Sequence, residues 1–445
     1  MHLLTNTRPM DGPMILLVLR MAGLFAVGAC LGSLVNWAAY TLAWNPRPIS
    51  PWAPPSPDAP PRRRIDRLPI LGWFWLNREA CVHGPRYWLR PMLVELCTGI
   101  AVAALYWWEI DKLGLVQGQA QFAGVLPLWP LYLQFASHTV LLCLMLAASL
   151  IDADEKIIPD EITVVGTILG LILAAVVPMS LLPHVDQRPA VPVVGVEIAP
   201  AAGGAGWWLE PVTPVAPREW PAAWADLQSW PTLLLAAACY LLWCFALAPR
   251  LWRGGRGAPF ALRLIAARVW REFRRPPLAW LVTYGMVTIC MLWLVGGPAR
   301  RTGLVTALVG LAASGGIVWA VRLIGTAALK REAMGFGDVT LMMMIGTFLG
   351  WQACLILFFL APFAGLIVGL MQFVLRRDDV IPYGPFLCLA AAVVVVAWAP
   401  IWNWARPMFE LGWLVPIVLV VCLVLLGLVL AIWQVIKGLL FGWES

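Results

Sequence analysis

The stretch LWPLYLQFASHTVLLCLMLAASLID, residues 128–152, decides the structural class of this protein. It contains no Lys, Arg, Asp or Glu before Asp152, and as a helix it is long enough to cross the roughly 30 Å hydrocarbon core of a bilayer. Hydrocarbon offers no partner to an unpaired backbone group, so such a segment must be helical. The stretch therefore predicts a membrane helix that ends in an acid.

The composition extends this prediction to the whole chain. Of 445 residues, 61% are hydrophobic and only 12% are charged, against about 25% charged in soluble domains. Too few charges remain to cover a soluble surface, which excludes a soluble enzyme, a disordered chain and a secreted disulfide scaffold. We expect an all-α, polytopic membrane helical bundle of ten or eleven apolar segments, at residues 14–42, 92–108, 128–151, 161–183, 230–249, 278–297, 302–328, 339–350, 353–375, 384–400 and 413–436.

Basic residues gather in alternate loops. Loops 45–91 and 250–277 each hold eight arginines. Because basic loops stay in the cytoplasm, the pattern predicts an external N-terminus and a cytoplasmic loop after every odd-numbered segment. Topology thus explains the net charge of +7, and no nucleic-acid partner is expected, only lipid. Loop 250–277 also fits an amphipathic helix lying on anionic lipid, with a solvated charge run as the alternative.

We divide the chain into five parts. Residues 1–110 hold the first two spans and an arginine-rich loop, 111–183 carry Asp152, 184–300 form an insertion with two added spans, 301–400 carry a glycine-rich turn, and 401–445 add a last span. Within the insertion, residues 184–229 are rich in Pro and Trp. They are expected to form an ordered external loop, or alternatively to anchor at the membrane interface through their Trp side chains.

Two acids stand out at the cytoplasmic ends of helices. Asp152 lies near a helix C-terminus, where a negative charge is disfavoured, whereas Asp160 reads as the N-cap of the next helix. Gly335 and Gly337 break the chain just before Asp338, which begins an apolar helix. Asp338 could itself be only an N-cap.

A pair of carboxyls would suffice for one kind of chemistry. Two like charges at one site resist joint ionisation, so one carboxyl stays protonated and acts as an acid. The other is ionised and takes a proton from water. That is aspartic proteolysis, which needs no metal and no cofactor.

The two acidic strings resemble the signature pair of prepilin peptidases, the GxGD aspartic proteases of type IV pilus and type II secretion systems. The strings are IDADEKIIPDEIT at 151–163 and AMGFGDVTL at 333–341. Four further strings resemble family motifs in the same order: GSLVN at 32–36, LPILGW at 68–73, VELCTG at 94–99 and IPYGPF at 381–386.

The resemblance implies a specific activity and specific site residues. Asp152 and Asp338 would be the catalytic pair, at the cytoplasmic face of the bacterial inner membrane. They would cleave the leader peptide of prepilin-like substrates after the Gly that precedes the hydrophobic helix. Gly335, Gly337 and Asp160 match motif positions, with Asp160 interpreted as a capping residue. Glu95 is a candidate for a supporting or substrate contact, with an ion pair to Arg86 or Arg90 as the alternative.

The sequence departs from the family pattern in two places. Many members carry two zinc-binding CxxC pairs in the first cytoplasmic loop, where this chain has only Cys81, followed by His83. Two such residues cannot complete a tetrahedral site, so we predict no zinc. S-adenosylmethionine is expected only if the family's N-methyltransferase activity is retained. The two Asp are 186 positions apart (338 minus 152), and the excess is the insertion, whose two crossings keep both acids on one side.

Two other classes of function stay open at this point. A transporter or channel would also carry intramembrane acids and glycine-broken helices, but the spans hold few polar residues beyond Gln134, His138 and Gln372. A non-catalytic membrane scaffold would suit the 27 Trp and the basic loops, but it leaves Asp152 and Asp338 unexplained. No feature of the sequence predicts the oligomeric state.

Overall fold

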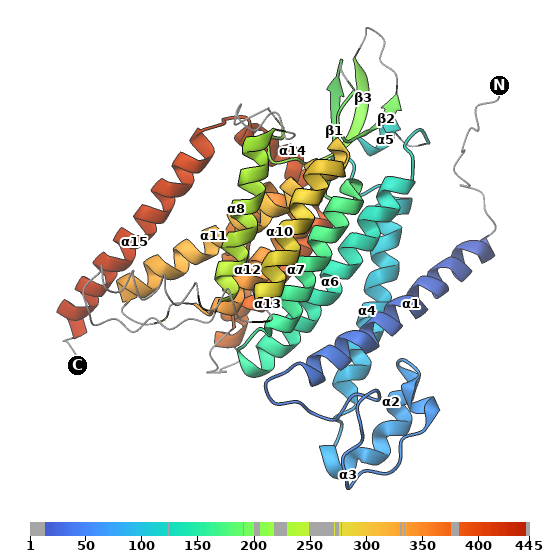
Figure 1. Ribbon diagram of the computed structural model, residues 1–445. Helices are drawn as coiled ribbons and strands as arrows, with labels where there is room; N and C mark the ends of the chain where they lie inside the picture. The colour runs from blue at the N-terminus through green and yellow to red at the C-terminus, as the bar shows by residue number, and fades with distance from the viewer. Residues whose placement is uncertain are drawn as a thin grey trace. The chain divides into compact units, whose positions relative to one another are not determined.

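The described residues form long apolar helices and one small sheet (Figure 1). The computed structural model describes residues 14–122, 124–189, 191–199, 205–217, 229–248, 271, 276, 278–329, 332, 334–374 and 382–441. Within these ranges eight helices are long and apolar enough to cross a membrane, or nine if a pair bent by 94° counts as one span. The predicted all-α polytopic class is confirmed. The amphipathic helix expected at 250–277 lies almost entirely outside the described residues, as do Trp220 and Trp224 of the Trp-rich loop.

The helix count differs from the expected ten or eleven for local reasons. α7 (Asp160–Val176) has 17 residues, just short of a full span. The segments expected at 339–350 and 353–375 form one continuous element, α12 (Phe336–Val374), which is broken at Gly350. Gly350 has φ 79° and ψ 170°, a conformation that only glycine adopts at little cost. The break therefore sits at the boundary that the sequence predicts between two segments.

The chain forms two compact units, each described here by itself. Unit 1 comprises residues 1–166, 182–211 and 356–405, and unit 2 comprises residues 167–181, 212–355 and 406–445.

In unit 1, α1 (Met14–Thr41) packs closely against α4 (Leu89–Tyr106) through glycines. A Cβ atom on Gly28 would lie 2.9 Å from the Cα of Gly99, so neither helix tolerates a side chain at this crossing. Small residues of this kind allow membrane helices to approach and to gain dispersion energy. α6 (Trp129–Glu155) contacts both α1 and α13 (Gly384–Val396), and it ends in the acidic string.

The loop between α1 and α4 folds into what we call the 45–88 module. Its elements are η1 (Arg64–Arg67), α2 (Leu71–Leu76), η2 (Asn77–Glu79) and α3 (Ala80–His83). The Arg62 side chain bonds both carboxylate oxygens of Glu79 at 2.9 Å and donates to the carbonyls of Pro48, Ser50 and Ala53. The Glu79 side chain is fully buried, so this ion pair fixes the core of the module.

A second ion pair closes the same module. Arg78 bonds both oxygens of the buried Asp66 side chain, at 2.5 and 3.0 Å. Burial alone would raise the pKa of Asp66, but the hydrogen bonds from Arg78 and from the backbone N–H of Arg63 outweigh it and lower that pKa. Asp66 is therefore held ionised.

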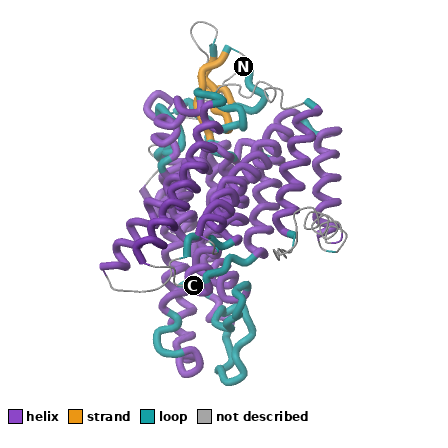
Figure 2. The backbone as a smooth tube through the Cα atoms, turned by 90° about the vertical axis from the view of Figure 1, so that its left-hand side faces the viewer, coloured by secondary structure: helices purple, strands orange, loops and turns teal. Residues whose placement is uncertain are grey.

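A three-stranded antiparallel sheet follows α7 in the chain, and the strands stand out in Figure 2. The strand order is β1 (Pro183–Arg188), β3 (Gly206–Pro211), β2 (Val196–Ala199), with a bulge between Glu197 and Ala199. The segment expected to be a Trp-rich loop thus contains a sheet. Its strands alternate too briefly to be distinguished from irregular structure in the sequence.

The sheet is fastened to α14 (Trp398–Phe409) within unit 1. The indole N–H of Trp398 donates to the carbonyl of Pro183 at 2.6 Å, and Trp398 stacks on Trp402 at 5.1 Å between ring centroids. Figures 1 and 2 both place the strands at the end of unit 1 opposite to the 45–88 module. α6 runs between these two ends, with Asp152 at the module end.

Unit 2 contains α8 (Trp230–Leu247), α10 (Leu278–Val295), α11 (Pro298–Leu329), the first half of α12 and α15 (Leu414–Phe441). The first half of α12 runs antiparallel to α11, because Met343 packs at Gly315 while Gly346 packs at Gly310. Its residues 339 and 341–345 are fully buried, which explains their unbroken apolar sequence.

Candidate active site

Asp152 is the buried acid near the C-terminal end of α6. Its neighbours are both engaged: Asp154 pairs with Arg90 at 2.8 Å, and Glu155 accepts hydrogen bonds from the backbone N–H groups of Trp44 and Asn45. Asp152 is 5% exposed, and its Oδ2 atom has no hydrogen-bond partner among the described residues. A buried acceptor without a partner is costly, and such groups persist where function needs them.

Gly384 covers this carboxyl. A Cβ atom on Gly384 would lie 2.5 Å from Oδ2 of Asp152 and 3.0 Å from Cδ1 of Ile158. Position 384 must therefore be glycine for Asp152 to keep its place. Gly384 opens α13 and belongs to the IPYGPF string, so the structure brings that motif directly onto the first acidic motif.

Asp160 lies apart from this buried position. It is the first residue of α7 and is exposed to solvent. The sequence predicts it as the N-cap that precedes the helix, whereas the helix begins at Asp160 itself. A negative charge in the first turn still favours the helix through its dipole.

Asp338 belongs to unit 2 and is 7% exposed. α12 begins at Phe336, so Asp338 is in the first helical turn and does not precede the helix as an N-cap would. The turn before it approaches closely, since a Cβ atom on Gly335 would lie 3.5 Å from Oδ2 of Asp338. Gly337 also contributes its carbonyl, which accepts a hydrogen bond from Thr340. Gly335 therefore lies just before α12 beside the acid, and Gly337 lies in its first turn.

Arg322 holds this glycine turn, a role that the sequence analysis missed. From α11 it donates through Nε to the carbonyl of Met334 at 2.9 Å and pairs with Glu332 at 2.7 Å. Its guanidinium carbon lies 5.6 Å from the centre of the Phe336 ring. One signal for it was in the sequence, because an arginine inside an apolar run is expensive and is retained for a purpose.

Asp152 and Asp338 therefore reside in different units, and their pairing stays a prediction. Asp160 and Glu95 are in unit 1 with Asp152, whereas Gly335 and Gly337 are in unit 2 with Asp338.

Glu95 is the centre of a separate buried cluster. Its Oε1 atom accepts hydrogen bonds from Ser33 at 2.7 Å and from Asn36 at 3.3 Å, and its Oε2 atom accepts one from the backbone N–H of Ile70 at 2.5 Å. Arg90 pairs with Asp154, so the alternative in which Glu95 pairs with Arg90 is wrong.

This cluster unites three of the motifs that the sequence analysis singled out. A Cβ atom on Gly32 would lie 2.6 Å from the Cα of Glu95, so the glycine brings the two helices together. Ile70 has φ 61°, a strained value for a β-branched residue, and its N–H bond to Glu95 holds it there. The strings at 32–36, 68–73 and 94–99 therefore form one site, adjacent to the 45–88 module.

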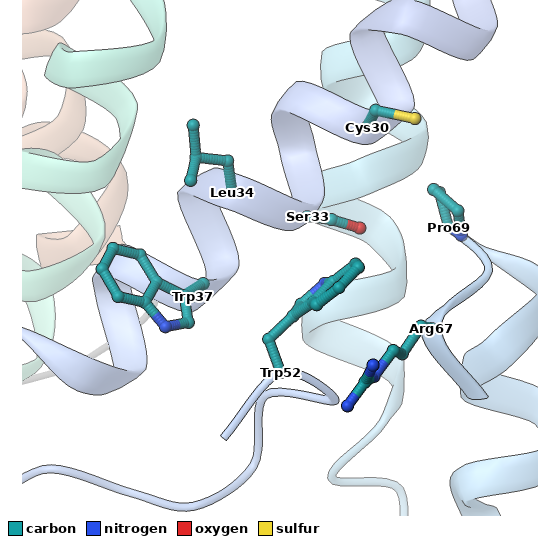
Figure 3. Close-up of a pocket in the computed structure, with 7 residues that line it drawn as sticks. All are labelled: Cys30, Ser33, Leu34, Trp37, Trp52, Arg67 and Pro69. Carbon is teal, nitrogen blue, oxygen red and sulfur yellow. The ribbon is translucent and has the colours of Figure 1, made fainter. Parts of the chain in front are cut away.

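An open groove of about 430 Å³ lies beside this cluster. Figure 3 shows Trp52 and Arg67 of the module facing the α1 side chains, with the Arg67 guanidinium 5.1 Å from the Trp52 ring. The groove is mainly apolar and aromatic, with one cation. Its lining residues are Cys30, Ser33, Leu34, Trp37, Trp52, Arg67 and Pro69.

The part of the chain that the structure describes contains no group of three or more His, Cys, Asp or Glu side chains able to hold a metal ion. Cys81 and His83 lie on α3, where the His83 ring is 3.5 Å from Glu79. The expectation of no zinc stays a prediction, which metal analysis of the purified protein would test.

Comparisons with known proteins address the family directly. Residues 272–370 match the type IV leader peptidase family. A prepilin leader peptidase/N-methyltransferase of Aeromonas hydrophila is 29% identical over 128 residues, 26% of this chain and 43% of that protein. One from Legionella pneumophila is 35% identical over 77 residues, 17% and 27% of the two chains. One from Pectobacterium carotovorum subsp. carotovorum is 29% identical over 163 residues, 36% and 55%.

The matches thus span about half or less of the relatives' lengths, and no solved structure matches the chain. The family match begins at 272, inside the part assigned as an insertion, and it contains the glycine turn with Asp338. It ends before the IPYGPF string, whose glycine covers Asp152. The resemblance to prepilin peptidases seen in the motifs is confirmed, and the family model matches residues 272–370 of the chain.

Proposed function

We propose that the protein is a membrane-embedded aspartic endopeptidase, which removes the leader peptide of prepilin-like precursors at the cytoplasmic face of the bacterial inner membrane. The observation that carries the proposal is the contrast at the end of α6. Asp154 and Glu155 are bound by neighbours, while Asp152 is buried under Gly384 with one unpartnered oxygen. Asp338, inside the family match, is the second carboxyl.

The chemistry needs only the two carboxyls and a water. The ionised carboxyl takes a proton from water, whose oxygen attacks the carbonyl carbon of the scissile peptide bond. The protonated carboxyl hydrogen-bonds the carbonyl oxygen as charge develops on it, and a proton then reaches the leaving nitrogen. Because the pair shares one proton, the two titrations belong to the pair and not to either residue.

The sequence pattern supports a common side for the two acids. Basic loops alternate along the chain, and the two added spans assigned to the insertion between Asp152 and Asp338 would return the chain to the side that it left.

The proposal is tested by expressing the full chain with a pilin-like precursor and reading cleavage by mass spectrometry. Asp152→Asn and Asp338→Asn should each abolish cleavage, whereas Asp154→Asn should retain it, because Asp154 only pairs with Arg90. Full cleavage by the Asp338→Asn protein would overturn the assignment. Failure of the unaltered protein to cleave any precursor would favour a transporter or a scaffold.

A second activity, N-methylation of the new N-terminus, is supported by the groove beside Glu95 and by the relatives' names. Trp37 and Trp52 would stack on the adenine of S-adenosylmethionine, and Arg67 would pair with its carboxylate. The bound cofactor would supply the methyl group. Calorimetric titration with S-adenosylmethionine should show binding that Trp52→Ala weakens, and absence of binding to the unaltered protein would remove this activity.

A further inference from the structure

The 45–88 module exposes an apolar face that its own fold does not cover. Four large side chains occur at every third residue from η1 to α2, and a fifth follows the last of them. Their relative exposures are 41, 47, 54, 56 and 43%. On the other side of the same elements, Asp66, Trp73 and Leu76 are no more than 1% exposed. We call the exposed set the 65–75 face, and it consists of Ile65, Leu68, Leu71, Phe74 and Trp75.

The charge around this face is positive. The module's two buried acids, Asp66 and Glu79, are neutralised by Arg78 and Arg62. Arg63 and Arg64 are exposed at the start of η1, immediately before Ile65. The face therefore combines exposed apolar side chains with exposed guanidinium groups, a combination typical of segments that lie in the interface of an anionic bilayer.

The 65–75 face is continuous with a membrane span. The ring centroids of Phe74 and Trp88 are 5.5 Å apart, and Trp88 directly precedes α4. The first residues of α4, Leu89 and Leu93, are 39% and 43% exposed, as expected for side chains that meet lipid. The apolar surface thus runs from the face through one aromatic contact onto a helix that crosses the bilayer.

A second exposed aromatic residue lies just after the end of α1. Trp44 follows the end of α1 and is 80% exposed. Trp side chains are enriched where one part of the ring meets hydrocarbon and another meets water. α1 and α4 both adjoin the module, so both helix ends point to one interfacial plane beside it.

We propose that the 65–75 face docks on an anionic phospholipid surface, at the end of the bilayer where α1 and α4 leave it. The apolar side chains enter the headgroup region, and Arg63 and Arg64 pair with lipid phosphates. This docking holds the module against the membrane independently of any substrate or cofactor, so it does not depend on the proposed peptidase activity.

The test measures backbone hydrogen exchange of residues 64–76 in the full-length protein, reconstituted in nanodiscs. One set of nanodiscs contains phosphatidylcholine only, and the other contains 30% phosphatidylglycerol. η1 and α2 are too short to protect their amides strongly by themselves, so docking should be visible. We expect exchange to slow by about thirtyfold in the anionic nanodiscs, given about 1 kcal/mol for each of the two arginines at such a surface.

Two variants and one control separate the contribution of the arginines from that of the apolar side chains. Arg63→Gln/Arg64→Gln should abolish the difference between the two lipids, and Leu71→Ser/Phe74→Ser should speed exchange in both. Arg86→Gln/Arg300→Gln removes the same charge from exposed positions outside the face and should change nothing. Exchange around Asp66 and Arg78 in each variant reports whether the module itself stays folded.

Three outcomes would overturn the proposal. One is equal exchange in neutral and anionic nanodiscs for the unaltered protein. Another is protection that appears in detergent and grows with protein concentration, which would assign the face to a second copy of the chain. The third is protection that appears only when a pilin-like precursor is added, which would assign it to substrate.

Discussion

The carboxyls of Asp152 and Asp338 lie at opposite ends of their helices. Asp152 stands at the C-terminal end of α6, where the helix dipole disfavours a negative charge, and a glycine from α13 covers it. Asp338 stands in the first turn of α12, where the dipole favours the charge, and an arginine-held glycine turn precedes it. Identical side chains thus meet opposite ends of the helix dipole.

The largest expected effect comes from filling the space beside the Asp152 carboxylate. Gly384→Ala places a methyl group 2.5 Å from its carboxylate oxygen and should lower peptidase activity by about a hundredfold, since displacement of a catalytic group by about 1 Å costs that much. The measurement is the rate of leader-peptide removal by purified protein in detergent. Gly316→Ala is the matched control, because a methyl group there meets nothing within 4 Å. Unchanged activity in Gly384→Ala would show that Asp152 need not be covered.

The corresponding change near Asp338 removes the arginine side chain that supports the glycine turn. Arg322→Gln loses the ion pair with Glu332 and the bond to the carbonyl of Met334, so Asp338 should be less well positioned. We expect activity to fall by about tenfold, mainly in kcat, with the pH profile shifted because Asp338 changes its surroundings. Arg322→Lys should restore part of the rate. If Arg300→Gln, at an exposed position, lowers activity as much, the effect is one of charge alone.

The smallest expected effect concerns Glu210, a buried acid in the sheet, and the stability of that sheet. Burial in the sheet, opposed by Arg188 and reinforced by Asp186, raises the pKa of Glu210 to about 7. A raised carboxyl pKa favours the folded sheet below pH 4.5, and that contribution is lost as pH rises through 7. Protection of β1 and β3 amides, corrected for intrinsic exchange, should fall about tenfold between pH 6 and 8. Glu210→Gln should abolish the dependence, and a dependence that persists in this variant would locate it at another group.

The sequence was most informative where charge is scarce. Asp152 was recognisable because it lies near a helix C-terminus, where a negative charge is disfavoured. In the described residues its Oδ2 atom has no hydrogen-bond partner, whereas Asp154 pairs with Arg90. The string around Asp338 was recognisable because two glycines precede an acid at the start of an apolar helix.

What escaped sequence analysis depends on contacts between distant segments. Arg322 reaches the glycine turn across a helix pair, and Glu95 gathers strings that lie more than fifty residues apart. The sheet at 183–211 escaped because its strands have four to six residues, with Pro and Trp in place of regular alternation. The break in α12 was anticipated as a boundary between segments, but the continuation of one helix across Gly350 was not.

One feature of the 45–88 module limits how this protein can evolve. The guanidinium of Arg62 uses all five of its N–H donors, two on Glu79 and three on the carbonyls of Pro48, Ser50 and Ala53. Lysine offers three donors from a single nitrogen, and no other side chain offers five in a plane. A saturation screen scored by protein abundance should therefore find codon 62 as intolerant as a core position, although the residue takes no part in the chemistry. A residue can thus be irreplaceable because of the number of bonds it makes, without being apolar or catalytic.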